Sequence, residues 1–216
     1  MVTMTTDLAN YKKKSLGLIR MNAIIGYLLD TLNYLNLNNM AEVHIIGQII
    51  DATDFDDRSL FAKWTINAGS RWNALEGFTA GQTHLTYKSP IDETYSWSHP
   101  IDVHYSTKGL QGWPKFEFQV WGVDWLGKSN ISAYGFMNIP MQPGLHKLTC
   151  STWRPVGDFR RRLIDYVTGY RMHLVDPSDL VSNGLNRHVI QSMSMGTIRV
   201  ELTIVLKDFE DYGVDI

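Results

Sequence analysis

The sequence is poor in the residues that most directly reveal a function. It has a single cysteine, Cys150, so no internal disulfide can form, and we expect a reducing compartment. Its 20 basic and 22 acidic residues give a formal net charge of −2. Nucleic-acid-binding domains usually carry a basic surplus, so we expect no nucleic-acid partner.

Long hydrophobic runs are also missing. The longest apolar stretch, Leu16 to Leu37, is interrupted by Arg20 and Asp30. It falls short of the about 20 apolar residues that a membrane-spanning helix needs. Arg20 also breaks the apolar centre that a signal peptide would need after the basic run Lys12 to Lys14. We therefore expect a cytoplasmic protein with no transmembrane segment.

Sequence motifs for catalysis are absent. The seven histidines show no H-E-x-x-H or related spacing, and no nucleophile elbow, P-loop or dinucleotide-binding loop occurs. His146 and Cys150 lie four residues apart, but no further metal ligand is evident near them. The sequence therefore predicts a protein that is not an enzyme and uses no cofactor.

What the chain does contain is a series of strand-like runs. In the clearest of them Phe116, Phe118 and Val120 point to one face, and polar residues alternate with them. Turn signals separate the runs, among them His99-Pro100 and the Gly-rich segment Lys108 to Trp113. The runs are Val43 to Ile49, Leu60 to Ile66, Gln82 to Tyr87, Ile101 to Tyr105, Lys115 to Trp121, Ile131 to Ile139, Leu145 to Cys150 and Thr197 to Leu206. About eight strands at regular spacing predict an all-β fold, an antiparallel two-sheet sandwich in residues 40–216.

Two segments follow a helical period instead. Apolar residues spaced by three and four predict an amphipathic helix from Ser15 to Leu35, in an N-terminal extension of residues 1–39. A helix that docks on the domain, a dimerising coil and a membrane-surface helix remain open for it. A short helix insertion is expected to begin at Asp158. Its basic residues are Arg160, Arg161 and Arg162. They either contact anionic lipid or an acidic partner, or they form a solvated face.

The loop after Trp121 resembles the last calcium-binding loop of a C2 β-sandwich. In C2 domains that bind calcium, this loop is Asp-x-Asp-x5-Asp, because several carboxylates must converge on a cation that takes six to eight oxygen ligands. Here the same spacing gives Gly122-x-Asp124-x5-Asn130. Two of the three carboxylates are therefore missing.

An earlier loop of the chain is acidic. Its candidate ligands are Asp51, Asp54, Asp56 and Asp57. C2 domains usually supply the next ligand from the aspartate of Asp-Pro-Tyr-Val-Lys, and the matching segment here begins with Ser59. Because too few anionic oxygens remain to neutralise a divalent ion, we expect these degraded loops to bind no metal.

The tip of the later loop carries a candidate contact site. Trp125, Leu126 and Lys128 lie where membrane-binding C2 domains insert apolar and basic side chains. These residues would then contact lipid or a partner. Alternatively, Trp125 folds back onto the sandwich.

Four motifs, in order along the chain, carry a more specific resemblance. They are Tyr95-Ser-Trp-Ser-His-Pro-Ile-Asp102, the turn Lys108 to Trp113, Cys150-Ser-Thr-Trp-Arg-Pro155 and Asp211-Tyr-Gly-Val214. Together they resemble the B9-domain family, a C2-like branch found in proteins of the ciliary transition zone. The resemblance covers residues 40 to 216, and Met40 to His44 is similar to the N-terminus of one family member.

The resemblance implies a structural role at the ciliary base, at the transition zone, basal body and centrosome. Family members act with other B9-domain proteins in a tectonic-like, Meckel syndrome module attached to transition-zone membrane proteins. That module is needed for cilium assembly and for the diffusion barrier at the ciliary base. The alternative left open is a peripheral membrane-binding C2 domain that recognises anionic lipid without calcium.

Overall fold

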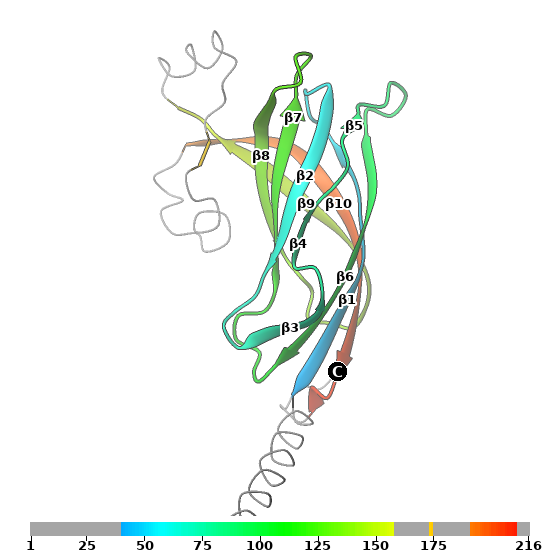
Figure 1. The fold of residues 1–216 in the computed structure, drawn as a ribbon, viewed down its shortest axis with the longest axis vertical. Coiled ribbons are helices and arrows are strands. Elements are labelled where there is room, and N and C mark those ends of the chain that lie inside the picture. Colours follow the sequence, from blue (N-terminus) through cyan, green and yellow to red (C-terminus); the bar gives the residue numbers. More distant parts are fainter. Residues whose placement is uncertain (1–39, 158–172, 175–190, 211–216) are drawn as a thin grey trace, which may run out of the picture. The chain divides into compact units, whose positions relative to one another are not determined.

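The computed structural model describes residues 40–157, 173–174 and 191–210 (Figure 1). The chain divides into two units, residues 1–40 and 41–216, and the strands of the described residues all lie in the second. None of the helices in these described residues is long and apolar enough to span a membrane. Three predicted features lie outside the described residues: the N-terminal helix, the helix from Asp158 with its three arginines, and the motif Asp211 to Val214.

The described part of the second unit is built from ten β-strands. They are β1 (Ala41–Thr53), β2 (Ser59–Asn67), β3 (Trp72–Gly77), β4 (Ala80–Gln82), β5 (Thr86–Tyr87), β6 (Tyr95–Thr107), β7 (Lys115–Val123), β8 (Ser129–Asn138), β9 (Gly144–Pro155) and β10 (Ser192–Lys207). All pairs are antiparallel. The predicted all-β antiparallel fold is confirmed.

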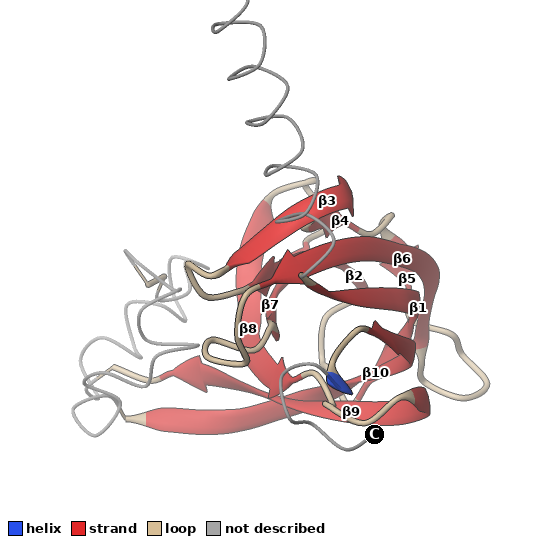
Figure 2. Ribbon diagram, turned by 90° about the horizontal axis from the view of Figure 1, so that it is seen from below, coloured by secondary structure: helices blue, strands red, loops and turns tan. Residues whose placement is uncertain are grey.

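The strands form one curled sheet in the order β3-β6-β1-β10-β9-β8-β7-β2-β4, with β5 added beside β2. Its two halves meet where β8 pairs with β9, and only Tyr134–Trp153 and Gly135–Thr152 are matched there. In Figure 2, β7 and β8 lie on one side of the interior and β1 and β6 on the other. The sheet thus folds over on itself like a sandwich whose halves remain joined at one narrow junction.

Two strand predictions differ from the structure, whose described residues form ten strands rather than eight. β3 was not predicted because Trp72 is its only buried residue, so it shows no alternation. The run Gln82 to Tyr87 is split between β4 and β5. Thr83 interrupts it because its hydroxyl accepts the Ala62 amide at 2.9 Å, while its own amide donates to the Ala62 carbonyl.

The core lies between the two halves of the sheet. On β7, Phe116, Phe118 and Val120 are buried, which confirms the predicted faces. Phe116 and Phe118 stack with ring centroids 4.9 Å apart, and Trp64 of β2 packs on Phe116 at 5.8 Å. The opposite half contributes a regular row from β10: Ile198, Val200, Leu202 and Ile204.

The predicted turn at His99-Pro100 is wrong. Both residues lie within β6, which begins at Tyr95. The β1–β6 register shifts here, since Ile49 pairs with His99 but Asp51 already pairs with Ser96. Ser98 has a φ of 45°, so the polar Ser-His-Pro sequence marks a bulge in a long strand rather than its end.

The Gly-rich segment Lys108 to Trp113 is a turn, as predicted, between β6 and β7. Gly112 has a φ of 78°, and a Cβ there would lie 2.6 Å from the Gly69 Cα. The Gly69 amide donates to the Gly112 carbonyl at 2.8 Å. This close approach places Trp113 edge-on to Trp72, with ring centroids 5.0 Å apart, and closes this end of the core.

Candidate functional site

Three connections meet at one end of the described domain, which we call the loop end. They are residues 54–58 between β1 and β2, residues 88–94 between β5 and β6, and residues 124–128 between β7 and β8 (Figure 1). Strand pairing brings them together. Ser59 pairs with Tyr87 of β5, and the adjacent Leu60 pairs with Gly122 of β7. The loop end is therefore where a C2 calcium site would lie.

Asp51 does not belong to the acidic loop in which the sequence placed it. β1 continues to Thr53, and Asp51 lies within it, buried, opposite Arg199 of β10. The Arg199 Nε donates to Asp51 Oδ1 at 2.6 Å, and Nη2 contacts the other carboxylate oxygen. This two-pronged ion pair joins β1 to β10, so Asp51 has a structural partner instead of a place in a metal site.

Asp57 fills the space next to Gly122. The Ser132 hydroxyl of β8 donates to Asp57 Oδ2. A Cβ on Gly122 would lie 2.5 Å from Asp57 Oδ1 and 2.6 Å from its Cγ. The Asp57 carboxylate therefore occupies the space in which a side chain at position 122 would begin, and Asp57 would have to shift to admit one.

Ser59 and Asp124 also have structural roles. The Ser59 hydroxyl donates to the Val123 carbonyl at 3.1 Å and ties the start of β2 to the end of β7. Asp124 Oδ1 accepts the amides of Leu126 and Lys128, both at 2.9 Å. These two bonds from backbone amides close the turn, so Asp124 has a structural role in its own loop.

The remaining candidate ligands lie in the β1–β2 connection and on β8. Asp54 and Asp56 are exposed, and Asp54 has a φ of 62° and accepts a hydrogen bond from the Thr53 hydroxyl. Asn130 lies on β8 opposite Gly122. Within the part of the chain that the structure describes, no three His, Cys, Asp or Glu side chains converge as a metal site would require. That the protein binds no calcium remains a prediction.

The loop end exposes large apolar side chains. Trp125 is 81% exposed and Leu126 69%, so Trp125 does not fold back onto the sheet. Ile91, in the β5–β6 connection, is 94% exposed, and Tyr87 is 64% exposed. Lys128 is only half-buried and follows the tip. The sequence predicted Trp125 and Leu126 as contact residues but not Ile91 or Tyr87. Ile91 and Tyr87 lie at the loop end only because β5 pairs with β2.

Two aromatic residues of the motif Tyr95 to Asp102 donate hydrogen bonds to the backbone at the loop end. The Tyr95 hydroxyl donates to the Phe55 carbonyl at 3.1 Å and contacts the Asp57 carbonyl oxygen. Burial, and then the charge of Asp57, raise the pKa of Tyr95 to about 12. The Trp97 indole donates to the Leu60 carbonyl at 3.3 Å. The aromatic residues of the motif therefore fix the path of the β1–β2 connection.

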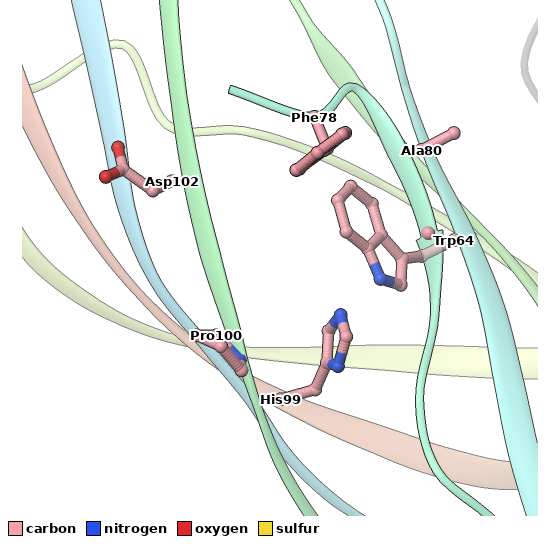
Figure 3. Close-up of a pocket in the computed structure, with 7 residues that line it drawn as sticks. Trp64, Phe78, Ala80, His99, Pro100 and Asp102 are labelled. Atoms are coloured by element: carbon pink, nitrogen blue, oxygen red, sulfur yellow. The ribbon is translucent and has the colours of Figure 1, made fainter. Parts of the chain in front are cut away.

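A separate pocket of about 360 Å³ lies between β6 and the β3–β4 connection. Trp64, Phe78 and His99 line it, and Figure 3 shows the nitrogen-bearing edge of the indole directed toward the His99 ring. The Trp64 Nε1 is buried and has no hydrogen-bond partner among the described residues. Burial, and then the nearby His84, lower the pKa of His99. A Cβ on Gly81 would lie 2.8 Å from the indole, so this glycine is needed to seat Trp64.

Comparisons with known proteins agree with these motifs. The chain is similar to B9 domain-containing protein 2 of Danio rerio, with 46% identity over 176 residues, covering 82% of this chain and 99% of that protein. Identity to the Homo sapiens protein of the same name is 44%, with the same coverage. B9 domain-containing protein 1 of Xenopus laevis is 29% identical over 175 residues, covering 79% of this chain and 87% of that protein.

Solved structures offer a more distant likeness. A C2 domain of plant Extended Synaptotagmin 1 matches with 13% identity and a TM-score of 0.38, covering 76% of this chain and 93% of that one. The sequence profile described as "B9-C2: Ciliary basal body-associated, B9 protein" matches residues 43–205, from β1 to β10. With that match and the 46% identity, the chain belongs to the ciliary basal body-associated B9 protein family.

Proposed function

We propose that this protein is a non-enzymatic structural component of a multiprotein complex at the ciliary base. It acts through contacts with other B9-domain proteins, and the complex is attached to membrane proteins of the transition zone. Through this complex it contributes to cilium assembly and to the diffusion barrier between cilium and cell body.

The observation that carries the proposal is the extent of the family match. It runs from residue 43 to residue 205, and the B9 domain-containing protein 2 relatives align over 99% of their own length. The relatives thus consist almost entirely of the B9 domain. We therefore assign the proposed role to this domain of the chain.

The state of the loop end supports a binding role without metal. The Asp57 carboxylate faces Ser132, and the Asp124 carboxylate closes its own turn. Ser59 holds β7 in place through Val123. These contacts shape the loops without a cation, so we expect partner binding to be independent of calcium.

Co-purification from ciliated cells tests the proposal. We expect the full chain and residues 40–216 alone both to recover other B9-domain proteins and to concentrate at the ciliary base. A matched variant with Asp54→Ala and Asp124→Ala should do the same. If folded protein recovers no B9-domain protein, the scaffold role is wrong. If only the aspartate variant loses its partners, the loops carry the binding and the scaffold proposal is wrong in its main point.

A further inference from the structure

We propose that the loop end is a docking surface for a basic amphipathic segment of a partner protein. Apolar side chains of that segment would cover Trp125, Leu126, Ile91 and Tyr87, while its Lys and Arg residues meet the surrounding carboxylates. The inference goes beyond the proposed function, because it names the chemistry of a binding partner other than the B9-domain proteins, whose recovery we expect not to need the loop carboxylates.

The apolar part of the surface comes from two connections. Trp125 and Leu126 project from residues 124–128, and Ile91 from residues 88–94, all of them more than two-thirds exposed. All three lie in connections at the same end of the domain, and exposed apolar surface there is a candidate binding site. Aromatic residues such as Trp and Tyr contribute most of the binding energy in many protein interfaces.

Local hydrogen bonds hold the backbone of these two loops in place before any partner arrives. Asp124 Oδ1 accepts two amides, and the Gly127 amide donates to the Asp124 carbonyl at 3.1 Å. In the other connection, the Ser89 amide donates to the Thr94 carbonyl at 2.9 Å and the Glu93 amide to the Ser89 carbonyl at 3.1 Å. Preorganised loops lose less conformational entropy when they bind.

Charge decides which kind of partner fits. The three connections contain six acidic residues and three basic ones, a formal net charge of −3: Asp54, Asp56, Asp57, Asp92, Glu93 and Asp124 against Arg58, Lys88 and Lys128. Lys88 is paired with Glu93 at 3.0 Å, which neutralises one charge of each sign and leaves the net charge of −3 unchanged. An anionic membrane attracts basic residues by roughly 1 kcal/mol each and repels carboxylates. The surplus of carboxylates therefore favours a basic protein segment over an anionic membrane.

A binding assay with the full chain tests this inference. The probe is a fluorescent amphipathic peptide of leucine and lysine, about five helical turns long. We expect its anisotropy to rise on binding, with an affinity that falls as salt increases. The same peptide with glutamate in place of lysine should not bind. If the lysine peptide does not bind, or both peptides bind equally, the proposal is wrong.

Variants locate the site. Trp125→Ser with Leu126→Ser should weaken peptide binding at least about tenfold, because exposed aromatic hot spots dominate such interfaces. The matched control is Met141→Ser with Leu145→Ser, a pair that is also exposed but lies at the β8–β9 connection and the start of β9, outside the loop end. Unchanged melting temperatures establish that both variants fold. Equal weakening by the two variants would overturn the assignment.

Vesicles separate a protein partner from a lipid surface. We expect the chain not to sediment with vesicles of phosphatidylcholine and phosphatidylserine. Sedimentation with these vesicles that is lost in the Trp125→Ser, Leu126→Ser variant would make the loop end a membrane-binding site and overturn the proposal.

Discussion

Replacing Gly122 by alanine tests the account of the loop end most directly. The φ of Gly122 lies outside the left-handed region, so its backbone conformation suits alanine. At a compatible position, Gly→Ala normally stabilises a protein by about 0.4–1 kcal/mol, because it reduces the entropy of the unfolded chain. The structure predicts the opposite sign here, since the new Cβ would lie 2.5 Å from Asp57 Oδ1.

The size of the loss follows from the contact that must break. Asp57 has to move away, which disrupts the hydrogen bond that it accepts from the buried Ser132 hydroxyl. A hydrogen bond to a charged group contributes about 1.5–3 kcal/mol. After subtraction of the entropic gain, we expect Gly122→Ala to lower the free energy of unfolding by about 0.5–2.5 kcal/mol.

Urea denaturation of four proteins provides the assay: the parent, Gly122→Ala, Asp57→Ala and the double variant. Because Asp57→Ala removes the clash as well as the hydrogen bond, the double variant should be less destabilised than the sum of the single ones. Stabilisation by Gly122→Ala alone, or strict additivity, would refute the reasoning. Gly122→Asp, which restores the C2 residue, should be worse still, because two carboxylates about 4 Å apart repel each other by up to about 4 kcal/mol. Calcium should not raise its melting temperature.

Three further predictions concern the core, the pocket and the cysteine. Phe118→Ala should lower the free energy of unfolding by about 3–5 kcal/mol, and the outward-facing Gln119→Ala by less than about 0.5 kcal/mol; equal losses in urea denaturation would mean that the faces of β7 are misassigned. Gly81→Ala should lower the melting temperature, because its Cβ would lie 2.8 Å from the Trp64 ring, and an unchanged value contradicts this. Burial raises the pKa of Cys150 to about 12, so iodoacetamide at about pH 9 should label the unfolded chain but not the folded one, and rapid labelling of folded protein would show that the thiol is accessible.

The strands whose two faces differ were predictable from the sequence. In β7 and in the central part of β10, buried residues alternate with more accessible ones, so their positions could be assigned from period two alone. β3 has one buried residue and shows no such signal. The bulge at Ser98 in β6 resembles a turn in sequence, because polar residues and a proline occur in both. Strand number and bulges depend on pairing partners that local patterns do not contain.

The sequence predicted which residues lie in the candidate site, but it did not predict which side chains they contact. Residue spacing revealed the loss of carboxylates at Gly122 and Asn130, but it could not show that Asp57 occupies the space beside Gly122. It placed Asp51 in the acidic cluster, whereas Arg199, 148 residues away, holds it within the sheet. For the same reason, the sequence could not decide whether Trp125 is exposed or folds back onto the sandwich. Each outcome depends on a neighbour that is distant along the chain.

The position of β1 in the sheet has a consequence for how the protein is made. β1 is the first strand of the described domain, yet its neighbours are β6 and β10, and β10 is the last of the described strands. During synthesis β1 cannot pair with β10 until the end of β10 has left the ribosome. Val43 and Ile45 therefore lack their strand partners, Leu206 and Ile204, until that point. Long-range strand pairing of this kind is slow and leaves unpaired edges open to aggregation. We therefore expect the domain to complete its fold only after β10 has been synthesised, and the nascent chain to depend on chaperones until then.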